Sequence, residues 1–158
     1  MIESHHPSPN FSSRGDTTIT MIVLHDTEGS AQGALQWLST PPSKRPDKSW
    51  SSCHVLIDKA GTVWRLINDD KKAWHVRDYN AISLGVELEM LPADPPGTFP
   101  PAQIESCVQW VAEKCKWYQI PLNRVVSHAS LDPARRTDPR GFDWFSFLLR
   151  VADRITNA

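Results

Sequence analysis

The chain has 158 residues, 17 of them basic and 18 acidic, which gives a formal net charge of −1. This balance gives no support to a nucleic-acid partner, which usually requires a basic surplus. The chain contains no run of about 18 apolar residues, so we expect no transmembrane helix. Hydrophobic residues make up 40% and charged residues 22%, as in ordinary globular proteins, and the length predicts one domain spanning 1–158.

The N-terminal residues 1–17 are rich in Ser, Pro, Asn and Gly and predict an irregular arm. The arm has no basic cluster and no apolar run, so we expect no signal peptide and synthesis in the cytoplasm. The chain has three cysteines without a short spacing, which favours buried thiols and a reducing compartment over disulfides.

The first half of the chain predicts a strand, a helix and a hairpin. Residues 18–25 are β-branched and apolar and indicate a buried strand. Ser30 can cap a helix that runs through about Leu38, and a polar loop follows over 41–50. Residues 54–58 and 62–66 then form a hairpin around a turn containing glycine.

The second half predicts a further strand, a helix, a short strand and a final helix. Residues 82–89 alternate strictly, with Glu87 and Glu89 on the polar side. Helices are expected over 102–118 and 143–155, on either side of a short strand at 123–128. Because strands alternate with helices, we expect a mixed α/β fold, a mixed β-sheet flanked by helices.

Two histidines end predicted strands, where a scaffold commonly presents functional side chains. His25 follows the first apolar run, and His128 follows Val125 and Val126. The loop after His128 adds two carboxylates, Asp132 and Asp138. Two histidines and one carboxylate can form a catalytic zinc site, whose bound water is acidified to a pKa of about 7. The residues alone do not choose between the aspartates, and both are also plausible turn formers beside prolines.

Several sequence blocks, taken in order, resemble the type-2 N-acetylmuramoyl-L-alanine amidase family, which also contains phage endolysins and peptidoglycan recognition proteins. The resemblance runs from about Ser8 to Trp144. It implies the same α/β fold and zinc-dependent hydrolysis of the amide bond between N-acetylmuramic acid and L-alanine. The blocks are Ser8–Phe11, Ile22–Thr27, Ser52–Asp58, Ala73–His75, Ile82–Glu89, Ser127–Pro139 and Phe142–Trp144.

The resemblance also implies roles for single residues. His25, His128 and Asp138 would bind Zn²⁺, which leaves Asp132 a role in shaping its loop. Recognition proteins that bind without cutting typically lack a ligand, so three filled positions favour an enzyme over a binding module. Glu87 would orient the water or take its proton.

Two parts of the expected machinery stay open. Arg136 occupies a position where many relatives carry lysine and would stabilise the oxyanion, although Arg135 is an alternative. His75 and Trp74 match a motif that lines the substrate groove, although a core role for Trp74 is equally plausible. Cys53 departs from relatives that carry tyrosine at this position.

The expected partner is peptidoglycan or a muropeptide, bound by a monomer. We expect a phage-type endolysin, because the loops 39–50 and 91–101 are shorter than those expected of recycling enzymes. The alternatives are a cytoplasmic amidase that recycles anhydro-muropeptides and a non-catalytic peptidoglycan-binding module.

Overall fold

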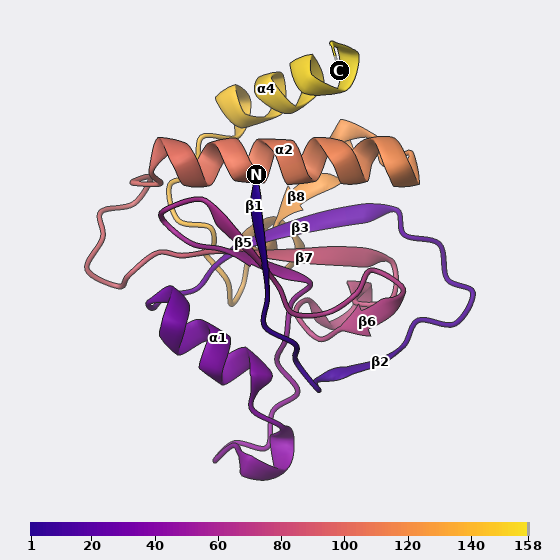
Figure 1. Cartoon of the computed structure of the whole chain (residues 1–158), viewed down its shortest axis with the longest axis vertical. Coiled ribbons are helices and arrows are strands. Elements are labelled where there is room, and N and C mark those ends of the chain that lie inside the picture. Colours follow the sequence, from indigo (N-terminus) through magenta and orange to yellow (C-terminus); the bar gives the residue numbers. More distant parts are fainter. Residues whose placement is uncertain (158) are drawn as a thin grey trace.

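The structure is a computed structural model that describes residues 1–157, and it is built on a six-stranded mixed sheet (Figure 1). The strand order is β1-β5-β4-β7-β3-β8. The strands of this sheet are β1 (Ile2–His5), β3 (Met21–Asp26), β4 (Val55–Ile57), β5 (Thr62–Arg65), β7 (Ser83–Leu88) and β8 (Val125–Ser127). A second sheet pairs β2 (Phe11–Ser13) with β6 (Lys71–Ala73).

The described residues 1–157 also form four α-helices and three short 3-10 helices, and α4 follows the last strand. The α-helices are α1 (Ala31–Ser39), α2 (Pro101–Tyr118), α3 (His128–Leu131) and α4 (Trp144–Thr156). The 3-10 helices are η1 (Pro42–Lys44), η2 (Arg77–Tyr79) and η3 (Leu122–Arg124). None of the described helices is both long and apolar enough to cross a membrane.

Helices cover both faces of the sheet, which confirms the mixed α/β fold expected from the sequence. In Figure 1, α2 lies across one face with α4 outside it, and α1 covers the opposite face. Strand β4 shows how the sequence specifies these layers, since Val55 and Ile57 pack in the cluster that contains α2, whereas Leu56 packs with Leu35 of α1. All six residues of β3 are buried, as expected of a strand covered on both faces.

The predicted hairpin, helices and alternating strand are confirmed. Strand β4 pairs antiparallel with β5, whereas β3 pairs parallel with both β7 and β8. The Ser30 hydroxyl accepts a hydrogen bond from the Gly33 backbone N–H at the start of α1, which is the expected N-cap. The parallel pairing brings the carboxyl ends of β3, β7 and β8 to one edge of the sheet.

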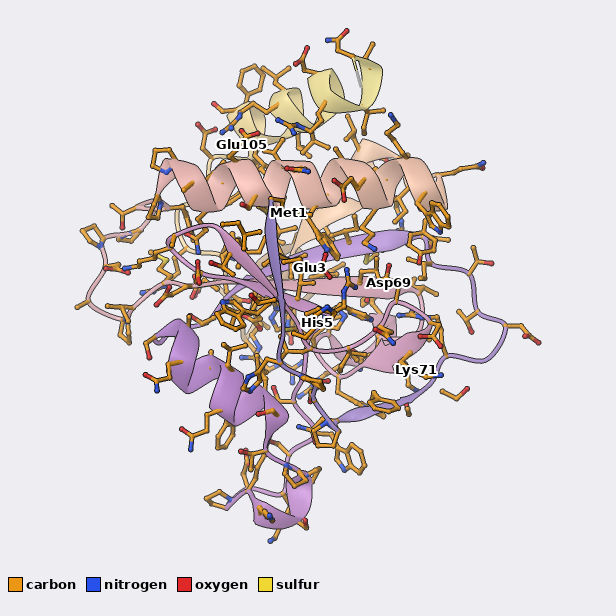
Figure 2. The ribbon with its side chains drawn as sticks, in the orientation of Figure 1. Met1, Glu3, His5, Asp69, Lys71 and Glu105 are labelled. Atoms are coloured by element: carbon orange, nitrogen blue, oxygen red, sulfur yellow. The ribbon has the colours of Figure 1, made fainter. Side chains whose placement is uncertain are left out.

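The prediction of an irregular arm over 1–17 is wrong in part. Strand β1 pairs parallel with β5, and β2 pairs antiparallel with β6. These edge strands are held by backbone hydrogen bonds while most of their side chains stay exposed, so they lack the apolar pattern that marks buried strands. In Figure 2, Glu3 and His5 lie along β1, and Glu3 accepts a hydrogen bond from Arg65 of the neighbouring strand.

The expected strand over 123–128 is shorter, and His128 does not end it. Strand β8 covers only three residues, and the chain turns into α3 at His128. The reason is local, because the Ser127 side chain caps α3 by accepting from the Ser130 N–H. The expected polar loop over 41–50 likewise contains the short helix η1.

Candidate metal centre and cleft

Three side chains converge where β3 and β8 end, and we call them the trio: His25, His128 and Asp138. The two Nδ1 atoms of the histidines are 3.0 Å apart. Oδ2 of Asp138 is 3.2 Å from Nδ1 of His25 and 3.0 Å from Nδ1 of His128. All three residues are buried, with 3 to 8% of their surface exposed.

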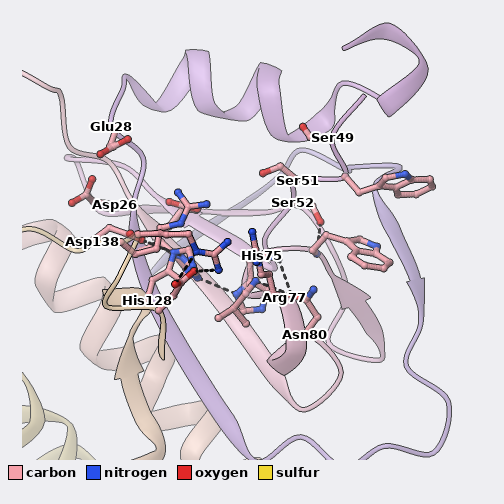
Figure 3. A pocket seen from close by; sticks show the side chains of 18 of the residues that line it. Asp26, Glu28, Ser49, Ser51, Ser52, His75, Arg77, Asn80, His128 and Asp138 are labelled. Atoms are coloured by element: carbon pink, nitrogen blue, oxygen red, sulfur yellow. Dashed lines mark hydrogen bonds and ion pairs between the residues drawn. The ribbon is translucent and has the colours of Figure 1, made fainter. Parts of the chain in front are cut away.

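The sheet and one loop bond assemble the trio. His25 and His128 follow apolar runs on neighbouring parallel strands, so both leave the sheet at the same edge. Asp138 arrives from the loop after α3, and its carbonyl oxygen accepts a hydrogen bond from the Ala129 N–H at the start of that helix. The loop thus folds back over α3 and places its second aspartate beside the histidines. Figure 3 shows His128 and Asp138 side by side in the cleft.

The donor set suits a zinc ion. Zinc bonds His nitrogen and carboxylate oxygen at about 2.0–2.2 Å, which places tetrahedral ligand atoms roughly 3.3–3.5 Å apart. The distances within the trio, 3.0 to 3.2 Å, are close to this spacing. Burial lowers the pKa of His25 and so keeps its imidazole neutral, as metal ligation requires. Burial by itself would raise the pKa of Asp138, but its contacts with the two neighbouring histidines lower it well below its usual range.

Glu87 lies beside the trio with a free carboxylate oxygen. It is the register partner of His25 in the pairing of β3 with β7. Its Oε2 atom is buried and has no hydrogen-bond partner among residues 1–157. Burial, followed by the negative charges of Asp138 and Asp26, raises the pKa of Glu87 well above its usual range. A carboxyl group with a raised pKa in a cleft can accept a proton during catalysis.

Glu89, the other acidic residue of the alternating segment, is occupied. Its Oε1 accepts from the Ala31 N–H and its Oε2 from the Lys59 N–H, both at 2.9 Å. These bonds tie the start of α1 and the β4–β5 turn to the end of β7. The geometry therefore separates a free carboxylate, Glu87, from a structural one, Glu89.

The two neighbouring arginines also differ. Arg135 pairs with Asp132, with its Nε atom 3.0 Å from Oδ1 of the aspartate. Asp132 therefore shapes the loop and lies outside the trio. Arg136 lines the cleft and, within the described part of the chain, has no side-chain hydrogen bond or ion pair. Its guanidinium therefore remains available to a ligand.

The cleft over the trio has a volume of about 740 Å³ and extends to two tryptophans. The ring centroids of Trp50 and Trp74 are 6.1 Å apart. Both line the cleft, but Trp50, which is 52% exposed, had no predicted role. An aromatic residue that ends a polar loop was the available signal, because such a side chain has no core to enter.

His75 also lines the cleft, as expected, but its ring is bonded inside the protein. Nδ1 of His75 is 3.0 Å from Nε2 of His25, and Nε2 of His75 is 3.1 Å from Oγ of Ser83. Neither ring nitrogen is therefore free to donate to a substrate. His54 and Cys53 are fully buried. Burial raises the pKa of the Cys53 thiol well above its usual range and keeps it protonated.

Comparisons with known proteins agree with this arrangement. A family model described as N-acetylmuramoyl-L-alanine amidase matches residues 15–141. The 1,6-anhydro-N-acetylmuramyl-L-alanine amidase AmpD of Haemophilus influenzae is 31% identical over 110 residues, which cover 63% of the chain and 58% of the relative. The chain spans about half the length of the curated relatives it matches, from 46 to 58%.

Solved structures share the fold. A crystal structure of an AmpD derivative superposes with a TM-score of 0.77 at 23% identity, covering 95% of this chain and 93% of that chain. AmiD of Escherichia coli, in complex with the substrate anhydro-N-acetylmuramic acid-L-Ala-D-gamma-Glu-L-Lys, gives a TM-score of 0.73 at 23% identity over 88% of this chain and 60% of that chain. At these identities the likeness establishes the fold.

Proposed function

The chain belongs to the N-acetylmuramoyl-L-alanine amidase family, and on that basis we propose that it is a zinc-dependent hydrolase of the bond between N-acetylmuramic acid and L-alanine. The observation that carries the proposal is the convergence of three buried ligand atoms in the trio, within 3.2 Å of one another. A module that only binds peptidoglycan has no need of such a set. We assign the whole span 1–158 to this amidase domain.

The protein would supply the ligands, a base and a cation. The trio would hold the zinc ion, which would acidify a water molecule and polarise a carbonyl group when bound. Glu87 takes the proton of the attacking water at its free Oε2 and then passes it to the departing amino group of L-alanine. Arg136 stabilises the negative charge that develops on the former lactyl carbonyl oxygen.

The tryptophan end of the cleft would hold the substrate. The rings of Trp74 and Trp50 have centroids 6.1 Å apart. Their apolar surface suits stacking against a sugar face or a peptide side chain. The Lys72 ammonium lies over the Trp74 ring, 4.7 Å from the ring centroid. Binding there would orient the muramyl-peptide amide across the trio. The protein would act as a monomer on peptidoglycan or muropeptides.

Two substrates compete for this site. Short loops at 39–50 and 91–101 support a phage-type endolysin, which stays in the host cytoplasm until it is released at lysis and acts on the cell wall. Similarity to the anhydro-muropeptide amidase of Haemophilus influenzae favours instead a cytoplasmic enzyme that recycles soluble fragments. Because this similarity is a specific observation, soluble anhydro-muropeptide is the second candidate substrate and is tested beside the intact cell wall.

The deciding experiment incubates the zinc-loaded protein with purified cell walls and, separately, with anhydro-muropeptide. Mass spectrometry of the products should detect new L-alanine amino termini, and the faster substrate identifies the setting. Chelation should abolish the reaction, and added zinc should restore it. A His25→Ala variant is the negative control. If neither substrate gains new amino termini, the protein is a binding module and the proposal fails.

A further inference from the structure

One ligand of the proposed zinc site is hydrogen-bonded on its far side to a second histidine. Nε2 of His25 is 3.0 Å from Nδ1 of His75, and Nε2 of His75 is 3.1 Å from Oγ of Ser83. The Ser83 hydroxyl is also 2.7 Å from the carbonyl oxygen of Tyr79. These four groups form a chain, the imidazole relay, which runs from the trio to a backbone carbonyl.

The backbone carbonyl fixes every proton in the relay. A carbonyl oxygen only accepts, so the Ser83 O–H must donate to Tyr79 and its Oγ must accept from His75. The neutral His75 ring then carries its proton on Nε2 and leaves Nδ1 as an acceptor. His25 must therefore donate its Nε2–H to His75, which leaves the lone pair of its Nδ1 directed at the other two trio atoms.

The strand beneath the relay is shaped to admit the His75 ring. A Cβ atom built on Gly85 would lie 2.6 Å from Cγ and 2.7 Å from Nδ1 of His75, and these ring atoms are its nearest neighbours. Only glycine leaves room for an imidazole at this position. On the other side, the backbone N–H groups of His75 and Val76 both donate to Oδ1 of Asn80, so the segment that carries the ring is fixed from two sides.

From this geometry we propose that His75 is a positioning residue that fixes His25 in the Nε2–H tautomer and so prepares Nδ1 to bind zinc. The inference rests on the proposed function, because it assumes that the trio holds a metal. The bond partner of a ligating histidine commonly contributes about 10–100-fold in metal affinity. In this chain that partner is an imidazole, which must itself be held in one tautomer by Ser83.

The test measures zinc affinity of the apo-protein by competition with a chromophoric chelator. His75→Phe removes the acceptor and should weaken zinc binding about 10–100-fold. His75→Asn places an amide oxygen where Nδ1 was and should stay within about threefold of wild type. His5→Phe, on the exposed edge strand, is the matched control. Thermal unfolding of each metal-free variant reports any loss of folding separately.

Two further measurements guard against a steric explanation. Gly85→Ala should displace the ring and weaken zinc binding, but should cause no additional loss in the His75→Phe background, where the bond is already absent, if both changes act through that bond. Long-range ¹H–¹⁵N spectra of the wild-type protein should show the proton of His25 on Nε2.

The outcomes separate this inference from the proposed function. Wild-type protein that binds no zinc overturns both. If the His75→Phe variant binds zinc as tightly as the wild type does, the inference alone is overturned. An equal loss of zinc affinity in His75→Phe and His75→Asn also overturns it. A His25 ring protonated on Nδ1 in the zinc-loaded protein also overturns it.

Discussion

His25 and Glu87 occupy paired positions on the adjacent parallel strands β3 and β7. Register partners in a sheet direct their side chains to the same face, so a proposed zinc ligand and an unpartnered carboxylate share one wall of the cleft. Neither residue depends on a flexible loop for its place. The pairing therefore supplies a rigid base for metal and proton chemistry, and each part can be tested separately.

Asp138 should be indispensable for metal binding, whereas Asp132 should not. Asp138→Asn removes a charged ligand, so zinc content should fall from about one ion per chain to near zero. Elemental analysis after dialysis measures this directly. Asp132→Asn disturbs only the pair with Arg135 and is the matched control, which should retain zinc. A variant at Asp138 that keeps full zinc content would contradict the assignment of the trio.

Glu87→Gln should slow catalysis without removing the metal. Loss of a general base typically costs about 10²–10⁴ in rate, and the carboxylate does not belong to the trio. The kcat for release of L-alanine-terminated peptide should fall within that range while zinc content is unchanged.

Glu89→Gln is the control for the preceding change. It weakens bonds from the Ala31 and Lys59 N–H groups, so it should lower the free energy of unfolding by about 1–2 kcal/mol and leave kcat nearly unchanged. Equal loss of kcat in the two variants would argue against a chemical role for Glu87.

Arg136→Ala should reduce kcat by about 10²–10³, the usual effect of losing a group that stabilises an oxyanion. Arg136→Lys should recover part of the rate because it keeps the charge but not the planar fork. Arg135→Ala provides the comparison, since its guanidinium is held by Asp132. If Arg135→Ala has a lower kcat than Arg136→Ala, Arg135 is the residue that stabilises the oxyanion.

His54 should make stability depend on pH. Burial lowers its pKa from 6.5 to about 4, and its Nδ1 accepts the Gly85 N–H at 2.9 Å. The unfolded chain binds a proton at higher pH than the folded chain does. The contribution of neutral His54 to the free energy of unfolding is therefore fully present above pH 6.5. As the pH falls towards 4, the free energy of unfolding decreases by roughly 3 kcal/mol.

Denaturant titrations of the zinc-loaded protein at several pH values measure this loss. His54→Asn keeps an acceptor for the Gly85 N–H but cannot titrate, so its stability should change less over the same pH interval. Identical pH profiles for the variant and the wild type would show that other groups produce the dependence.

Trp74→Ala and Trp50→Ala should each raise KM about 2–10-fold with a smaller change in kcat, because they remove stacking surface away from the trio. Steady-state kinetics with muropeptide separate the two constants. Trp117, 79% exposed and outside the cleft, provides a control in Trp117→Ala, which should match wild type. An unchanged KM in both cleft variants would remove the tryptophans from the substrate site.

Local pattern was sufficient for much of this protein. The apolar run before His25, the alternation around Glu87 and the cap at Ser30 each predict an element that the structure contains, because burial and capping act over a few neighbouring residues. The edge strand Ile2–His5 escaped prediction, because backbone pairing with a distant strand leaves little trace in the side chains.

The sequence by itself determined the α/β class and singled out His25 and His128, since these follow from periodicity and from the position of a polar residue after an apolar run. The family resemblance favoured Asp138, Glu87 and Arg136, but only the tertiary structure shows the contacts that distinguish them from Asp132, Glu89 and Arg135. Asp132 and Arg135 are bonded to each other, and Glu89 is bonded to two backbone N–H groups. For Glu89 and Asp138 the difference depends on contacts between segments far apart in the chain.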